Sequence, residues 1–426
     1  MTGSIIAVFI TGYLLITLEH SIKINKAASA LITAVLCWTI FILNATDKEL
    51  VGEELAHHLG ELSGILFFLL GAMTIVELAD LYNGFDIITT RINQTNKVKL
   101  LWIVSFITFF LSAVLDNLTT TIVILSLLNK LIKNREDRLF FAGMTVIAAN
   151  AGGAWSPIGD ISTTMLWIGG QVTALNIIKA CFFPSLACII VPLIYMSFRL
   201  KGEIEKPVDI DNNRGKNIPK KQQYIIFFSS VVVLIMVPVF KTITHLPPYM
   251  GVLLGLSLLW IITEILRQKD DVEDKGALSV SYALRKIDTP SVLFFLGILL
   301  SVASLQSSGI LTDLSGWLTA TIRSERIIVI AIGLLSAIVD NVPLVAAAQG
   351  MYSLSQYPTD SFFWEFLAFC TGTGGSALII GSAAGVVAMG IERINFFWYL
   401  KKISLLALLG YFAGIIIFLL QHYFFG

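Results

Sequence analysis

Long apolar segments alternate with short polar ones along the whole chain. Residues 64–76, 225–240 and 403–420, for example, contain no charged side chain. A helix rises 1.5 Å per residue, so about 20 apolar residues cross the roughly 30 Å hydrocarbon core of a bilayer. The pattern predicts ten membrane spans, at 4–19, 27–43, 61–79, 139–170, 178–198, 224–241, 248–266, 288–306, 362–391 and 399–422.

Two further apolar segments, 99–133 and 325–353, are too long for one membrane-crossing helix. Each carries an Asp-Asn pair near its middle, Asp116-Asn117 in the first and Asp340-Asn341 in the second. An Asp-Asn pair ends one helix and caps the start of the next. We therefore predict that each segment is a re-entrant helical hairpin with the pair at its tip.

Two of the spans are interrupted by glycine. Segment 139–170 contains Gly-Gly and Ser-Pro, and segment 362–391 contains Gly-Thr-Gly-Gly-Ser. Glycine permits positive φ and proline removes a backbone donor, so both unwind a helix. Unwound backbone within a bilayer is tolerated only where it is buried in protein or lines a cavity. Each span is predicted to be a broken helix.

The long polar segment 199–223 divides the chain into halves, 1–198 and 224–426, that repeat one another. The Asp-Asn pairs recur at an offset of 224, the Gly-Gly pairs at 222, and a Leu-Phe-Phe-Leu string at 227. Each half has five spans, an odd number, so the second half enters the membrane from the opposite side. The predicted fold is an all-α polytopic membrane protein of two inverted-topology repeats, each with five spans, one hairpin and one broken helix.

Composition and charge agree with this class. Apolar residues make up 56% and charged residues 14% of the chain, and mean hydropathy is +0.82. Lys and Arg total 29, as do Asp and Glu, so no net positive field attracts nucleic acid. If both termini face outside, all but five basic residues lie on the inner side, as the positive-inside rule requires. The exceptions are Lys48, Lys179, Lys241, Arg323 and Arg326.

Three carboxylates fall within these elements: Asp116 and Asp340 at the hairpin tips and Asp160 in the first broken helix. A charge near the bilayer centre costs at least about 2.5–3.5 kcal/mol, so such a residue indicates a functional site. The span interiors and tips hold no basic partner, and the nearest cations lie in loops or at span ends. The carboxylates are therefore expected to hold a proton or a metal cation. Freed backbone carbonyls and the hydroxyls of the broken helices add oxygen ligands for a hard cation.

Glu77, three residues before Asp80 at a predicted inner boundary, is either an interfacial acid or the group through which protons enter. The outer stretch 53–61 has His and Glu at metal-ligand spacing but is interpreted as a solvated helix face. Nucleotide-binding, zinc-protease and serine-hydrolase motifs are absent from the sequence. Coupling is thus expected from ion gradients, with no cofactor.

The string Asn-Ala-Gly-Gly-Ala-Trp-Ser-Pro-Ile-Gly-Asp-Ile-Ser-Thr-Thr-Met-Leu-Trp, residues 150–167, resembles the signature of NhaD-type sodium/proton antiporters. The paired tips and inverted halves resemble the wider ion-transporter superfamily of arsenite permeases and dicarboxylate or citrate transporters. The resemblance covers roughly 60–175 and 287–395. It implies a scaffold with oligomer contacts, a homodimer, and a moving transport part of hairpins and broken helices. It also implies export of Na⁺ or Li⁺ against H⁺ across a bacterial inner membrane.

By motif match, the resemblance carries ion-binding roles onto both halves. Together with the residue analysis it gives these candidate ion-binding residues: Asp116, Asn117, Thr119, Asn150, Ser156, Asp160, Thr163, Asp340, Asn341, Thr373 and Ser376. Five of them are the expected Na⁺ ligands: Asp116, Asn117, Asp160, Asp340 and Asn341. The second half has Ser382 where the first has Asp160, so its site has one carboxylate fewer.

Three other functions remain as alternatives. Carboxylate co-transporters of the same fold resemble Ser-Asn-Thr at both tips, whereas the tips here carry Asp, which repels an anion. Arsenite is neutral at pH 7, and only the string 150–167 speaks against an arsenite permease. An intramembrane aspartyl protease would also need two buried aspartates. Pro157-x-Gly159-Asp160 only approaches its Gly-x-Gly-Asp motif, and Pro-Ala-Leu is absent from the sequence.

Overall fold

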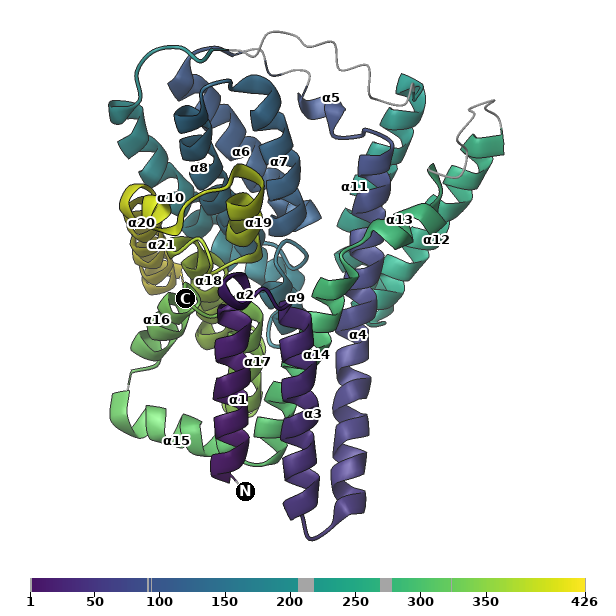
Figure 1. Cartoon of the computed structure of the whole chain (residues 1–426), viewed down its shortest axis with the longest axis vertical. Coiled ribbons are helices and arrows are strands. Elements are labelled where there is room, and N and C mark those ends of the chain that lie inside the picture. The colour runs from purple at the N-terminus through teal and green to yellow at the C-terminus, as the bar shows by residue number, and fades with distance from the viewer. Residues whose placement is uncertain are drawn as a thin grey trace.

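The computed structural model describes residues 2–89, 92, 94–205, 218–268, 278–322 and 324–425, and its regular elements there are helices (Figure 1). The first half contains α1 (Thr2–Thr17), α2 (Glu19–Ile22), α3 (Lys26–Asn44), α4 (Lys48–Leu81), α5 (Asp86–Thr89), α6 (Lys97–Leu115), α7 (Asn117–Leu131), α8 (Arg135–Ala154), α9 (Ile161–Ile168) and α10 (Ala174–Arg199). The second half contains α11 (Lys220–Thr244), α12 (Pro248–Gln268), α13 (Val280–Lys286), α14 (Thr289–Ser307), α15 (Ile310–Ile322), α16 (Glu325–Leu335), α17 (Asn341–Met351), α18 (Phe362–Gly374), the 3₁₀ turn η2 (Gly375–Ala377), α19 (Ala383–Glu392), α20 (Phe396–Lys402) and α21 (Ser404–Phe425). The middle of the predicted linker 199–223, residues 206–217, lies outside the described residues.

The predicted apolar segments are helical in the structure. Within the described residues, eight helices are long and apolar enough to cross a membrane. In Figure 1, α6, α7 and α8 pack together as one group, and α11 and α12 run alongside α4. The chain is therefore a multi-pass membrane protein built from helices.

Helix α4 is longer than the span 61–79 predicted from hydropathy. It has 34 residues and begins at Lys48, where the Asp47 side chain accepts hydrogen bonds from two backbone amides. Residues 48–60 contain no proline, so nothing stops the helix before the apolar segment begins. The stretch 53–61 accordingly lies on this helix, and the imidazole of His57 is 3.4 Å from the carboxylate of Glu61.

Several short helices escaped the hydropathy pattern. Helices α13 and α15 lie in segments that were predicted to be connections. The predicted span 399–422 is also wrong at its start, because the chain breaks at Ile403 between α20 and α21. α20 ends in Lys401 and Lys402, which are exposed, so its boundary is set by polar groups and not by the apolar run.

Helices α6 and α7 form a tight antiparallel pair joined by one residue. Asp116 forms the turn alone, with φ 86° and ψ 160°, a left-handed backbone conformation that costs energy for any residue but glycine. The start of α6 and the residues after α7 both form hydrogen bonds with the extended segment 202–205. The amide of Lys97 donates to Gly202 O (3.2 Å) and that of Lys133 donates to Glu205 O (2.9 Å). The chain therefore returns to the side from which it came.

The corresponding pair in the second half has a looser tip. Five residues, 336–340, separate α16 from α17. The prediction that each Asp-Asn pair starts a helix is confirmed, because Asp116 caps α7 and Asp340 caps α17 through side-chain carboxylates.

Both predicted broken helices are broken where glycine occurs. Residues 155–160 separate α8 from α9, and residues 378–382 separate η2 from α19. The packing around the breaks recurs in the two halves. The hydroxyl of Ser112 donates to Ala149 O (2.6 Å), and that of Ser336, 224 residues on, donates to Thr371 O (3.1 Å).

The glycines at these breaks allow close backbone approach. A Cβ on Gly152 would overlap the carbonyl oxygen of Phe109, and a Cβ on Gly374 would overlap that of Gly333. These pairs again differ by 222 and 224 residues. Hairpin and broken helix thus touch in the same way in both halves.

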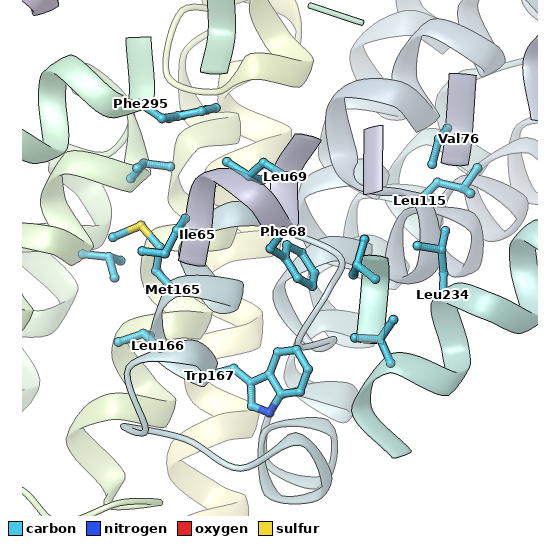
Figure 2. Close-up of a cluster of buried hydrophobic side chains, with 14 of the residues drawn as sticks. Ile65, Phe68, Leu69, Val76, Leu115, Met165, Leu166, Trp167, Leu234 and Phe295 are labelled. Carbon is cyan, nitrogen blue, oxygen red and sulfur yellow. The ribbon is translucent and has the colours of Figure 1, made fainter. Parts of the chain in front are cut away.

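An apolar cluster joins α4 to these elements. Figure 2 shows Phe68 and Leu69 of α4 between the tip residue Leu115 and the α9 residues Met165 and Trp167. The rings of Phe68 and Trp167 meet edge to face, with centroids 6.4 Å apart. The hairpin tip and the short helix α9 therefore rest on the middle of α4.

Candidate functional site

The carboxylate of Asp160 is the point where both hairpin tips meet. Asn117 Nδ2 donates to its Oδ1 and Asn341 Nδ2 donates to its Oδ2, each at 2.9 Å. The hydroxyl of Ser162 also donates to Oδ2. Asp160 is only 3% exposed. Residues 43 and 181 positions away are thus brought to one buried carboxylate.

Asn150 links the two broken helices through hydrogen bonds. Its Oδ1 accepts from Asn117 Nδ2 (3.1 Å), and its Nδ2 donates to the hydroxyls of Ser376 and Ser382 (both 2.9 Å). All four residues are buried. Buried polar groups are stable when they are fully hydrogen-bonded, so this network fixes the relative positions of the two breaks.

The other two aspartates lie beside the network, each in a cavity of its own. Asp116 accepts from the amide (2.8 Å) and hydroxyl (2.9 Å) of Thr119 and lines a cavity of about 60 Å³ next to α4. Asp340 accepts from Val342 N (3.3 Å) and lines a second cavity of about 60 Å³ beside Tyr13.

The three aspartates lie close together. Asn117 and Asn341, which both donate to Asp160, directly follow Asp116 and Asp340 in the chain. The ion pairs among the described residues include none of the three, as the sequence predicted. Asp160 is buried and the two tip aspartates are half-buried, so like charges on all three would require neutralisation by protons or cations.

One cation is nevertheless nearer than the sequence indicated. Lys26 was assigned to a loop, but its side chain lines both the cavity of Asp116 and the cavity of Asp340. The amino-acid pattern could not reveal this, because Lys26 lies 90 or more residues from either tip.

Two predicted site residues donate their hydroxyl hydrogen bonds to backbone carbonyl oxygens. The hydroxyl of Ser156 donates to Ala113 O and that of Thr373 to Phe369 O, each at 2.6 Å. Thr163 Oγ1, in contrast, is buried and has no hydrogen-bond partner among the described residues, and Thr163 lines neither of the two cavities.

Glu77 is placed apart from the three aspartates. It forms an ion pair with Lys286 (3.9 Å) and lines neither of the two cavities.

Two hydroxyls in the network were not among the predicted residues. Ser382 corresponds to Asp160 at the offset of 222, which was a usable signal. Ser162 follows Asp160 by two residues at the start of α9, a position from which a side chain can reach back to a helix cap. The sequence string around Asp160 contained it, but its role depends on the fold.

Helix α9, which begins after Asp160, is held at its other end by a cation from the second half. Lys241 Nζ of α11 donates to Trp167 O (2.6 Å) and lies 4.6 Å from the centre of its indole ring. A cation at a helix C-terminus stabilises the exposed carbonyls. The eight-residue α9 is thus fixed at both ends by other elements.

Apolar spanning helices, with two hairpin tips and two broken helices that meet around one buried carboxylate, define a membrane ion transporter. The family model described as "Citrate transporter" matches residues 13–365. Sodium/proton antiporter 2 of Arabidopsis thaliana is 46% identical over 97% of this chain and 98% of its own length. Sodium/proton antiporter 1 of the same plant is 49% identical over 96% and 71%, respectively. The Na⁺/H⁺ antiporter NhaD of Vibrio cholerae is 31% identical over 98% and 91%.

The chain belongs to the citrate transporter family and, within it, to the NhaD-type sodium/proton antiporters, as residues 150–167 predicted. These relatives are named as transporters, so the chain is a transporter and not an enzyme. The aspartyl protease alternative is therefore wrong.

Proposed function

We propose that this protein exchanges Na⁺ or Li⁺ for H⁺ across the membrane by competition at Asp116, Asp160 and Asp340. The observation that carries the proposal is the carboxylate of Asp160, which receives one amide N–H from each hairpin tip. Amides orient a carboxylate without neutralising it. Each amide donates through its nitrogen, so its carbonyl oxygen is directed elsewhere and can serve as a ligand for a hard cation.

The chemistry of exchange follows from this arrangement. A protonated carboxyl group has no net charge, so it does not attract Na⁺ as the ionised carboxylate does. Repulsion between neighbouring ionised aspartates favours binding of some cation, whichever is more abundant on the side to which the site opens. Proton release and Na⁺ binding on one side, followed by the reverse on the other, give exchange without any other energy source.

The nearest competing function is transport of a carboxylate, because the matching family model is described as a citrate transporter. Citrate is a polyanion at neutral pH, and three aspartates around the site would repel it. The relatives named above as sodium/proton antiporters also favour a cation. Arsenite is neutral, so charge does not exclude it, and the transport assay below tests it directly.

We propose that transport proceeds by alternating access of a unit made of the hairpins and broken helices. The recurrence of Ser112–Ala149 contacts as Ser336–Thr371 supports a duplicated architecture, which we interpret as two inverted repeats. A homodimer, an inner membrane of a bacterium as the location, and termini on the outer side stay predictions. Relatives from both a plant and bacteria carry the name antiporter.

The test uses purified protein in lipid vesicles that contain a pH-sensitive dye and an imposed pH gradient. Na⁺ or Li⁺ should dissipate the gradient, whereas K⁺, succinate, citrate and arsenite should not. Asp160→Asn should abolish the response, and Asp313→Asn, an exposed aspartate on α15, should leave it unchanged. Proton movement driven by citrate and not by Na⁺ would refute antiport and establish the carboxylate alternative.

A further inference from the structure

Lys26 is the one residue with a positive charge that lines both cavities containing the tip aspartates, among the residues described. It is the first residue of α3, next to the capping residue Asn25. One cavity holds Lys26 with Asp340, and the other holds Lys26 with Asp116. The side chain of Lys26 therefore borders both of the cavities that contain a tip aspartate.

Among the residues that the structure describes, no carboxylate forms an ion pair with that ammonium. Glu19, also in the cavity of Asp340, uses its carboxylate to accept from the backbone amide of Lys26 (3.1 Å). The ammonium itself lies 4.4 Å from the centre of the Phe294 ring, a contact that is weak at a partly exposed site. A lysine has four rotatable carbon-carbon bonds in its stem, so it can reach in more than one direction.

The groups that face Lys26 come from each element packed around it. They are Tyr13 of α1, Glu19 of α2, Asp340 at the second tip and Asp116 at the first tip. Three of these four are carboxyl groups, which are negative when ionised, and two of the three are at the tips, so the field there attracts the ammonium.

We propose, on the basis of the antiport function above, that Lys26 is a built-in counter-cation that competes with Na⁺. When the tip aspartates are ionised and no Na⁺ is bound, the ammonium moves toward them and balances their charge. Na⁺ then binds against the repulsion of this ammonium. Lys26 therefore lowers the affinity for Na⁺ and so assists its release.

The direct test compares three variants in the vesicle assay at a fixed alkaline pH and constant ionic strength. Lys26→Gln should lower the Na⁺ concentration for half-maximal exchange roughly tenfold, the effect of one unit charge across a small, partly screened site. Lys26→Arg should keep it within about twofold, since the charge remains. Lys23→Gln is the matched control, because Lys23 is exposed and lines neither cavity, and should not change it.

A structural role for Lys26 predicts a different outcome. Loss of the contact with Phe294 alone would lower thermal stability and leave the Na⁺ affinity unchanged or weaker. An unchanged or higher half-saturating Na⁺ concentration in Lys26→Gln, with wild-type exchange intact, overturns the proposal. Absence of Na⁺-driven exchange in the wild type overturns the antiport function instead.

A second experiment restores the charge after folding. Lys26→Cys can be modified in the folded protein, because the four native cysteines are buried. Reaction with 2-aminoethyl methanethiosulfonate adds an ammonium group and should return the half-saturating Na⁺ concentration toward the wild-type value. Reaction with methyl methanethiosulfonate, which adds no charge, should leave it low. Equal effects of the two reagents would overturn the proposal.

Discussion

Replacement of Asn341 by alanine should shift the pH dependence of exchange without unfolding the protein. Asn341 donates one hydrogen bond, 2.9 Å long, to the buried carboxylate of Asp160. A hydrogen bond to a charged group contributes about 1.5–3 kcal/mol. Its loss makes the ionised carboxylate less favourable relative to the protonated one. Since one pH unit corresponds to about 1.36 kcal/mol, the pH of half-maximal exchange should rise by about 1–2 units.

The measurement is the initial rate of Na⁺-driven proton movement in dye-loaded vesicles at a series of pH values and one fixed, sub-saturating Na⁺ concentration. The matched control is Asn44→Ala, because Asn44 is exposed at the end of α3 and its amide donates only to Ile40 O. Melting temperatures of both variants in detergent establish that they are folded. A profile for Asn341→Ala that coincides with the wild type would refute the view that proton binding at Asp160 controls exchange.

Three further predictions concern coupling, packing and topology. If Na⁺ and H⁺ compete at Asp160, each unit fall in pH should raise the half-saturating Na⁺ concentration about tenfold for one proton, and a constant value would assign the proton to another group. Gly152→Ala should destabilise the protein by about 1–3 kcal/mol, because the added Cβ would overlap the backbone of Phe109. The control Gly60→Ala, which has open space around the added Cβ, should leave stability unchanged. Equal melting temperatures of the two variants would contradict this prediction. Lys97→Cys and Arg135→Cys should both resist an impermeant thiol reagent added from outside, and labelling of only one would disprove the hairpin.

Much of the helical architecture followed from simple physical rules. Most apolar runs near 20 residues formed the helix expected of them, as did the two Asp-Asn pairs and the glycine breaks, whereas the run 399–422 is interrupted at Ile403. These features act locally, through helix capping and backbone freedom, so the sequence alone is sufficient. Helix α15 was missed because it is amphipathic, and the polar start of α4 was not joined to the span 61–79, because hydropathy alone does not detect helix outside apolar runs.

The candidate site was only partly predictable. The aspartates and tip asparagines could be named, but the hydrogen bond from Asn341 to Asp160 spans 181 residues. The sequence placed Lys26 in a loop and Lys241 at a span end, and only tertiary packing brings them to the cavities and to α9. Long flexible side chains reach several ångströms from their backbone, and sequence position does not determine that direction.

The two amide hydrogen bonds to Asp160, one from each half of the chain, have a consequence for biosynthesis of the protein. Translation adds about 5–20 residues per second, so roughly 10–40 s separate the synthesis of Asp160 from that of Asn341, 181 residues later. During this interval the nascent first half has a carboxylate at membrane depth with only one of its two amide donors. A polypeptide that ends before residue 341 therefore keeps an incompletely bonded charge inside the bilayer. Such a fragment is expected to be degraded by membrane proteases and not to persist as a smaller transporter.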